Sequence, residues 1–208
     1  MSAASEAVAP AAPSAAPGPP RSEERRRTGV PHAVMGTLIF IVTELMVFAG
    51  MVSAFNIVKS RSPAEWWPPP TQPRLPVEAT AVNTGVLLLS GVVMFLAARA
   101  WSKDPARGVR LLRVAVGLGA TFVIVQGTEW YLLIEQGLSM TVSAHSAFFC
   151  LIIGCHALHA IGALVALVWV LRRMGRGVAT QGQFQAAQAF WYFVVGVWPI
   201  LYARVYLL

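Results

Sequence analysis

Five long apolar runs dominate the pattern of hydrophobic and polar positions along the chain. They cover about 32–58, 81–100, 111–135, 142–171 and 184–207. A helix of about 20 apolar residues crosses the roughly 30 Å hydrocarbon core of a bilayer. Each run is long enough to do so, and the segments between the runs are short and polar. The pattern therefore predicts an all-α integral membrane protein, a bundle of five transmembrane helices.

The composition agrees with this pattern and sets the N-terminal segment apart. Of the 208 residues, 56% are hydrophobic and 12% are charged, whereas a soluble domain carries roughly 25% charged residues. Residues 1–30 contain the run APAAPSAAPGPP followed by RSEERRR, and this composition has too little apolar surface to offset the loss of chain entropy on folding. We expect residues 1–30 to form a disordered cytoplasmic tail and residues 31–208 to form the membrane domain.

Most of the basic residues flank three positions: the start of the first run, the loop after the second run and the end of the fourth. They are Arg21, Arg25, Arg26 and Arg27, then Arg99, Lys103, Arg107, Arg110 and Arg113, and finally Arg172, Arg173 and Arg176. Short loops rich in Lys and Arg remain on the cytoplasmic side. This distribution predicts an inside N-terminus and an outside C-terminus. Topology and anionic lipid head groups account for the net charge of +7, so no nucleic-acid partner is needed.

Two acidic residues lie inside apolar runs. Glu44 interrupts FIVTELMVFAG about 12 residues past the start of the first run, or roughly 18 Å along a helix. Such residues face a bundle interior or a cavity, which leaves transport, metal binding and helix packing open for Glu44. We expect it to be protonated or hydrogen-bonded, because an ionised carboxylate in apolar surroundings is poorly solvated. Glu129, near Gln126, fits a proton path or, more commonly, a polar cluster that joins two helices.

Two histidines and two cysteines fall in the fourth run. His156 and His159 are three residues apart, so they lie on one side of a helix, which is compatible with joint metal ligation. The other histidines lie near the ends of runs, so we favour buried imidazoles hydrogen-bonded to a neighbouring carboxylate or backbone group, and we expect no metal site in this chain. Cys150 and Cys155 are five residues apart on one predicted helix, beyond the roughly 7 Å reach of a disulfide.

Five motifs, in order and at characteristic spacing, resemble subunit III of the haem-copper oxidases, the family of cytochrome c and quinol oxidases, from about Val34 to Leu208. The first is FIVTELMVFAG, and the second is WPPP, in the proline-rich loop Glu65 to Glu78, followed by PVEATAVNTGVLLLSGV. The others are FVIVQGTEWY, AFFCLIIGCHALHAIGA and FWYFVVGVWPILY. Full-length members have seven helices, and the chain resembles the shorter five-helix form.

The resemblance implies a non-catalytic accessory subunit that carries no cofactor itself. It implies contact with subunit I, which holds haem and copper, in a complex with subunit II in the bacterial inner membrane. It also implies a V-shaped bundle whose cleft holds phospholipid. The acid matching Glu44 faces that lipid in the family and is linked to proton uptake by the oxygen reductase. The residues matching structural polar positions are Glu78, Asn83, Gln126, Glu129, His156 and His159.

The last helix departs from the family pattern at two positions. Tyr192 stands where the family commonly has His, and Val195 stands where it has Asp, which removes a polar link between this helix and its neighbours. The alternatives are a subunit-III-like accessory protein of a nitric oxide reductase and a membrane scaffold or assembly protein. A small transporter is disfavoured, because the chain shows no internal repeat or broken helix. The electron donor, cytochrome c or a quinol, and membership of a supercomplex depend on other subunits.

Overall fold

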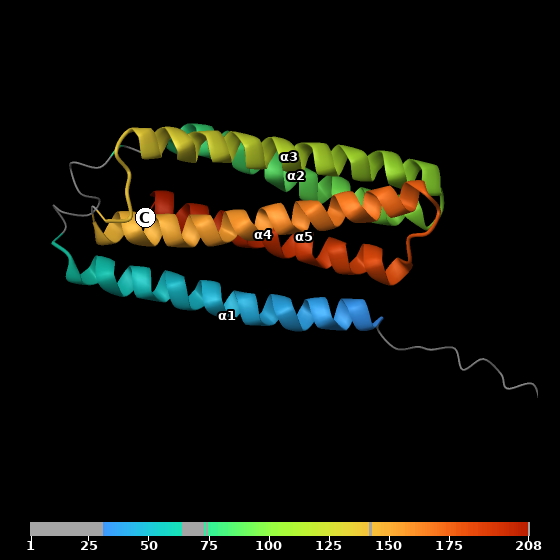
Figure 1. Cartoon of the computed structure of the whole chain (residues 1–208), viewed down its shortest axis with the longest axis horizontal. Coiled ribbons are helices and arrows are strands. Elements are labelled where there is room, and N and C mark those ends of the chain that lie inside the picture. Colours follow the sequence, from blue (N-terminus) through green and yellow to red (C-terminus); the bar gives the residue numbers. More distant parts are fainter. Residues whose placement is uncertain (1–30, 64–72, 74, 142, 208) are drawn as a thin grey trace, which may run out of the picture.

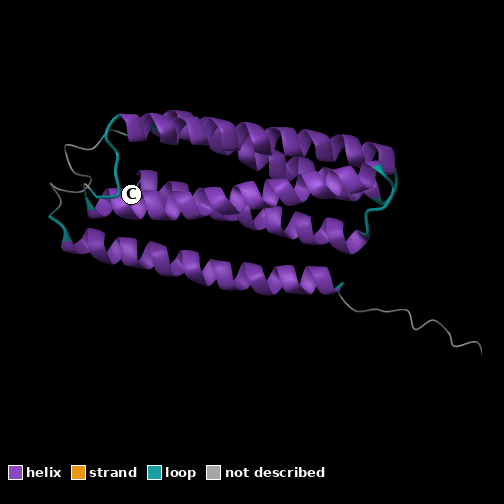
Figure 2. Ribbon diagram, in the orientation of Figure 1, coloured by secondary structure: helices purple, strands orange, loops and turns teal. Residues whose placement is uncertain are grey.

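The computed structural model describes residues 31–63, 73, 75–141 and 143–207. Within these residues it contains helices and no strands (Figure 2). The helices are α1 (His32–Arg61), α2 (Val77–Trp101), α3 (Pro105–Glu135), α4 (Ala144–Gly175) and α5 (Gln181–Tyr202), and a π-helical turn, η2 (Ala203–Leu207), continues α5. Five helices are long and apolar enough to cross a membrane, which confirms the predicted all-α membrane protein. The expected tail 1–30 and most of the proline-rich loop lie outside the described residues.

Polar capping residues explain why some helices begin before the apolar runs do. Helix α3 begins at Pro105, where proline is favourable because the first turn needs no backbone donor. The Asp104 carboxylate accepts a hydrogen bond from the Arg107 backbone N–H at 3.0 Å. Helix α5 begins with a capping box between Thr180 and Gln183. These polar turns extend the helices beyond the segments that hydropathy detects.

The helices form three layers (Figure 1). The α2–α3 pair lies on one side, α4 and α5 lie in the middle, and α1 packs against α4 and α5 on the other side. The start of α1 and the α2–α3 and α4–α5 loops lie at one end of the bundle, at the right of Figure 1. Among the described residues, this end carries the basic residues from Arg99 to Arg113 and from Arg172 to Arg176, so we call it the basic end.

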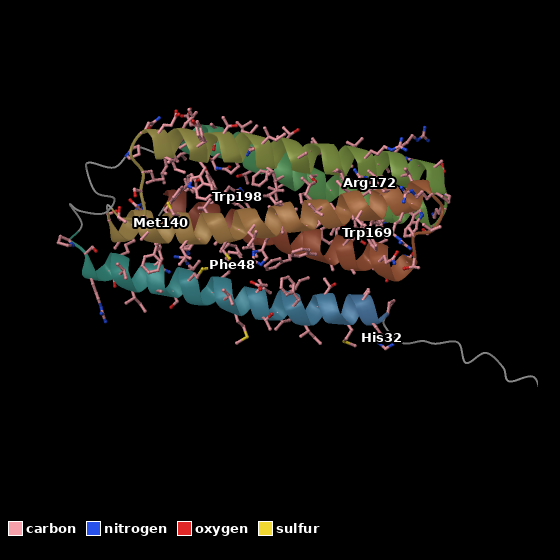
Figure 3. All side chains as sticks on the ribbon, in the orientation of Figure 1. His32, Phe48, Met140, Trp169, Arg172 and Trp198 are labelled. Atoms are coloured by element: carbon pink, nitrogen blue, oxygen red, sulfur yellow. The ribbon has the colours of Figure 1, made fainter. Side chains whose placement is uncertain are left out.

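Two buried tryptophans of α5 hold the central layer against α2. The Trp191 indole N–H donates to Ser90 Oγ at 3.1 Å, and the Trp198 indole N–H donates to Thr84 Oγ1 at 2.8 Å. Both rings are almost fully buried, and such rings need a partner for their N–H group. The core of the bundle therefore depends on these indole–hydroxyl contacts, and Trp198 is labelled inside the bundle in Figure 3.

The two departures in α5 have simple structural consequences. Val195 packs against Gly91 of α2, and a Cβ atom added to Gly91 would lie 3.1 Å from Val195 Cγ1. Tyr192 accepts a hydrogen bond from Gln188 Nε2 at 3.0 Å within the same helix. An apolar contact with a glycine thus takes the place of the polar link that relatives are expected to have at position 195.

Candidate functional site

The carboxylate predicted at membrane depth meets a histidine from another helix. Glu44 Oε2 of α1 lies 3.1 Å from His159 Nε2 of α4, and the two side chains are 20% and 10% exposed. The contact joins helices that are far apart in the sequence. It also places Glu44 at the edge of the bundle, where part of its side chain remains accessible.

The hydrogen bonds of the imidazole determine how it can bind the carboxyl group. His159 Nδ1 lies 2.8 Å from the backbone oxygen of Cys155, and a carbonyl oxygen can only accept, so Nδ1 carries a hydrogen. In the neutral ring Nε2 is then an acceptor and would bind a protonated carboxyl group. In the charged ring Nε2 would donate to a carboxylate instead. A hydrogen bond between Glu44 and His159 therefore requires one proton in this contact.

Aromatic rings surround the contact between Glu44 and His159. The His159 ring lies 5.5 Å from Phe48 and 6.1 Å from Phe40, measured between ring centroids, and both phenylalanines belong to α1. Phe193 and Phe190 of α5 lie at 5.8 Å and 6.3 Å. Figure 3 labels Phe48 where α1 faces the middle layer. The contact therefore lies in apolar surroundings, where polar groups need a partner.

His156 has a different environment although it is only one helical turn away. Its side chain is 2% exposed and lies between Phe48 and Trp198, with ring centroids 6.2 Å and 5.0 Å away. Among the described residues neither ring nitrogen has a hydrogen-bond partner. The ring lines a cavity of about 140 Å³ between α3 and α4, together with Gln126. His159 thus contacts a neighbouring carboxylate and a backbone oxygen, whereas His156 has neither kind of partner among the described residues.

A second polar cluster joins α2, α3 and η2. Glu129 Oε2 accepts from Thr80 Oγ1 at 2.9 Å and from Gln126 Nε2 at 3.1 Å. Asn83 Nδ2 donates to Gln126 Oε1 at 3.3 Å, and Gln126 Nε2 approaches the Tyr206 hydroxyl at 3.4 Å. The structure thus brings three of the predicted polar residues into one hydrogen-bonded group. The geometry is that of a helix-joining cluster.

The sequence interpretation missed two members of this group and included one residue that stands outside it. Thr80 lies three residues before Asn83 on the same side of α2, and this helical spacing was an available signal. Tyr206 follows α5 in η2, and no local pattern connects it to Glu129. Glu78 is exposed in the first turn of α2 and takes no part in these hydrogen bonds. Cys150 and Cys155 are free thiols, as expected.

Comparison with known proteins assigns the family. A family model described as cytochrome c oxidase subunit III matches residues 27–208. A probable cytochrome c oxidase subunit 3 from Nocardia farcinica is 34% identical over 176 residues, which cover 83% of this chain and 86% of the relative. Cytochrome c oxidase subunit 3 from Mus musculus is 31% identical over 179 residues, 82% of this chain and 67% of the relative. The chain therefore belongs to the cytochrome c oxidase subunit III family.

Proposed function

We propose that this chain is a non-catalytic subunit III of a respiratory haem-copper oxygen reductase in a bacterial inner membrane. It would contact subunit I, in a complex that also contains subunit II, and the haem and copper would lie in these partner subunits. Its role would be to stabilise subunit I and to support proton uptake by subunit I. Family membership supports the place in a cytochrome c oxidase complex. The observation that supports the proton-linked role is the contact between Glu44 Oε2 and His159 Nε2, which can hold one proton.

The Glu44–His159 pair gives the proposed role in proton uptake a physical basis. Moving the proton between Glu44 Oε2 and His159 Nε2 changes the charge distribution without changing the net charge. It therefore avoids the desolvation that an isolated charge would suffer at membrane depth. Glu44 is also partly accessible beside the exposed apolar side chains Leu45 and Met46 of α1. We propose that phospholipid covers this face, in the V-shaped cleft inferred from the resemblance, with the N-terminus inside and the C-terminus outside.

The test is a comparison of Glu44 variants in the intact complex. Glu44→Gln keeps a hydrogen-bonding side chain but cannot hold the titratable proton, and Glu44→Ala removes the contact. We expect both variants to take up protons more slowly and to lose activity sooner during prolonged turnover, at unchanged haem content. Glu78→Gln is the matched control because it removes an exposed acid outside the pair. Unchanged turnover, proton pumping and inactivation in both Glu44 variants would refute the proton-linked role.

A second candidate follows from the loss of polarity in α5. The Val195–Gly91 contact replaces a polar link expected of oxidase relatives, which favours a subunit-III-like accessory protein of a nitric oxide reductase. Purifying the tagged chain in mild detergent separates the candidates. Oxygen consumption by a co-purifying haem protein supports the oxidase, and nitric oxide consumption supports the second candidate. A preparation without haem and without a large partner indicates a scaffold or assembly protein.

A further inference from the structure

An open groove lies at the basic end of the bundle, between the start of α3 and the end of α4. Its volume is about 520 Å³, and its lining includes Ala106, Val109, Arg110 and Arg113 of α3 and Met174 of α4. These residues belong to the helices that are apolar and long enough to span a membrane. The groove therefore lies where a spanning helix pair would emerge from the bilayer.

The two arginines of the groove have no side-chain partner among the described residues. Arg110 and Arg113 are three residues apart, so their side chains leave the same side of α3, and both are exposed. Neither guanidinium forms an ion pair or a hydrogen bond with the part of the chain that the structure describes. The nearby acid Asp104 accepts from the Arg107 backbone N–H at the start of the helix. Within the described residues, these two cations thus face the groove without a carboxylate opposite them.

Two other arginines at this end contact the protein. Arg99 lies over the ring of Phe95, with 5.7 Å between its guanidinium carbon and the ring centroid. Arg173 donates from Nε to Gln183 Oε1 at 3.1 Å, and its guanidinium also lies over the Trp169 ring at 4.9 Å. A general surplus of positive charge at a helix end is expected from topology alone. Arg110 and Arg113 differ from the remaining exposed arginines at this end because they line the groove.

The remaining lining is apolar. Ala106 and Val109 of α3 and Met174 of α4 contribute it, and Met174 is 8% exposed. A ligand in the groove therefore meets two guanidinium groups and an aliphatic wall. Arginine binds phosphate oxygens through two parallel N–H groups, and basic pockets between transmembrane helices on the cytoplasmic side suit phospholipid head groups. A soluble phosphate compound would leave the aliphatic wall uncovered.

We propose that this groove binds one anionic phospholipid. Its phosphate would accept hydrogen bonds from Arg110 and Arg113, and its glycerol and the first part of an acyl chain would pack on Val109 and Met174. The site is separate from the lipid expected beside Glu44, because α1 packs against α4 and α5 while the groove is formed by α3 and α4. The inference goes beyond the proposed function and does not depend on the proton-linked role of Glu44.

The test measures lipid affinity in the purified intact complex after delipidation. Phosphatidylglycerol, phosphatidylethanolamine and inorganic phosphate are titrated separately and followed by native mass spectrometry. We expect phosphatidylglycerol to bind most tightly. Because each arginine would donate charge-assisted hydrogen bonds to the lipid phosphate, we expect roughly a tenfold loss of affinity for Arg110→Gln or Arg113→Gln and roughly a 100-fold loss for the double variant.

The matched control is the double variant Arg172→Gln/Arg176→Gln. It removes the same charge from exposed residues at the same end, outside the groove lining, and Figure 3 labels Arg172 there. We expect less than about a twofold effect, since only the general surface charge changes. An equal loss in the control, or equal affinity for both lipids, would overturn the proposal. So would tight binding of inorganic phosphate alone, or loss of a partner subunit at unchanged lipid affinity, which would assign the groove to an acidic protein segment.

Discussion

Replacing Gly119 by alanine should destabilise the bundle, because the absence of a side chain at position 119 leaves room for the buried ring of Trp191 in α5. A Cβ atom at position 119 would lie 2.6 Å from Trp191 Cη2 and 2.7 Å from Cζ2. Carbon atoms of this kind pack at about 3.5–4.0 Å, so the ring or the helix must move by roughly 1 Å. Trp191 is fully buried and donates to Ser90 Oγ at 3.1 Å. The ring cannot retreat without weakening that hydrogen bond.

The magnitude follows from three contributions. Overpacking of this kind costs about 1–3 kcal/mol, and weakening the Trp191–Ser90 hydrogen bond adds about 0.5–1.5 kcal/mol. The higher helix propensity of alanine stabilises the helix by about 1 kcal/mol and offsets part of this loss. We therefore expect Gly119→Ala to lower the free energy of unfolding by about 0.5–3.5 kcal/mol.

The assay is thermal unfolding of the purified complex, compared with Gly117→Ala. Gly117 lies two residues earlier on the exposed side of α3, and a Cβ atom there has no neighbour within 4 Å. A loss of 1 kcal/mol lowers the Tm of a chain of this size by about 2–4 °C. We expect a lower Tm for Gly119→Ala and an unchanged or slightly higher Tm for Gly117→Ala. If Gly119→Ala is as stable as the control, the packing argument is wrong.

Three further substitutions test the other contacts. Trp198→Phe removes the donor to Thr84 and reduces the buried ring volume, so we expect a loss of about 1–3 kcal/mol in thermal unfolding; an unchanged Tm would show that neither the hydrogen bond nor the packing of this ring contributes. Asn83→Leu leaves Gln126 Oε1 without its donor and should cost about 1–3 kcal/mol, whereas a stabilised variant would contradict the cluster's role. Phe48→Ala should cost about 3–5 kcal/mol and raise hydrogen exchange in α1 selectively; uniform exchange across the helices would contradict a local role.

The sequence predicts the five helices because a bilayer requires long apolar runs, and this requirement is visible in every span. It does not predict the helix ends, because polar residues set them. Asp104 and Thr180 cap α3 and α5 ahead of the apolar residues, and hydropathy does not register such turns. Small residues such as glycine in a membrane helix indicate close packing against a neighbouring helix. Only the structure shows that Gly119 receives Trp191.

Glu44 and the two histidines of α4 are predictable from the sequence as candidate site residues, but the contact between Glu44 and His159 is not. Positions three apart on an α-helix differ by about 60° around its axis, so His156 and His159 share a side yet face different neighbours. His159 faces Glu44 of α1, and His156 faces Trp198 and the cavity beside α3. Which histidine meets the acid depends on how α1 packs against α4, and that long-range arrangement leaves no local signal.

The Glu44–His159 contact lies in the interface that attaches α1 to the bundle. Helix α1 has only Phe48 and Phe55 as buried residues, whereas the other helices contribute most of the core. The contact and the rings around it lie in this thin interface. Because removing one partner of a buried polar contact leaves the other partner unsatisfied, a substitution at Glu44 or His159 should also loosen the packing of α1 against α4.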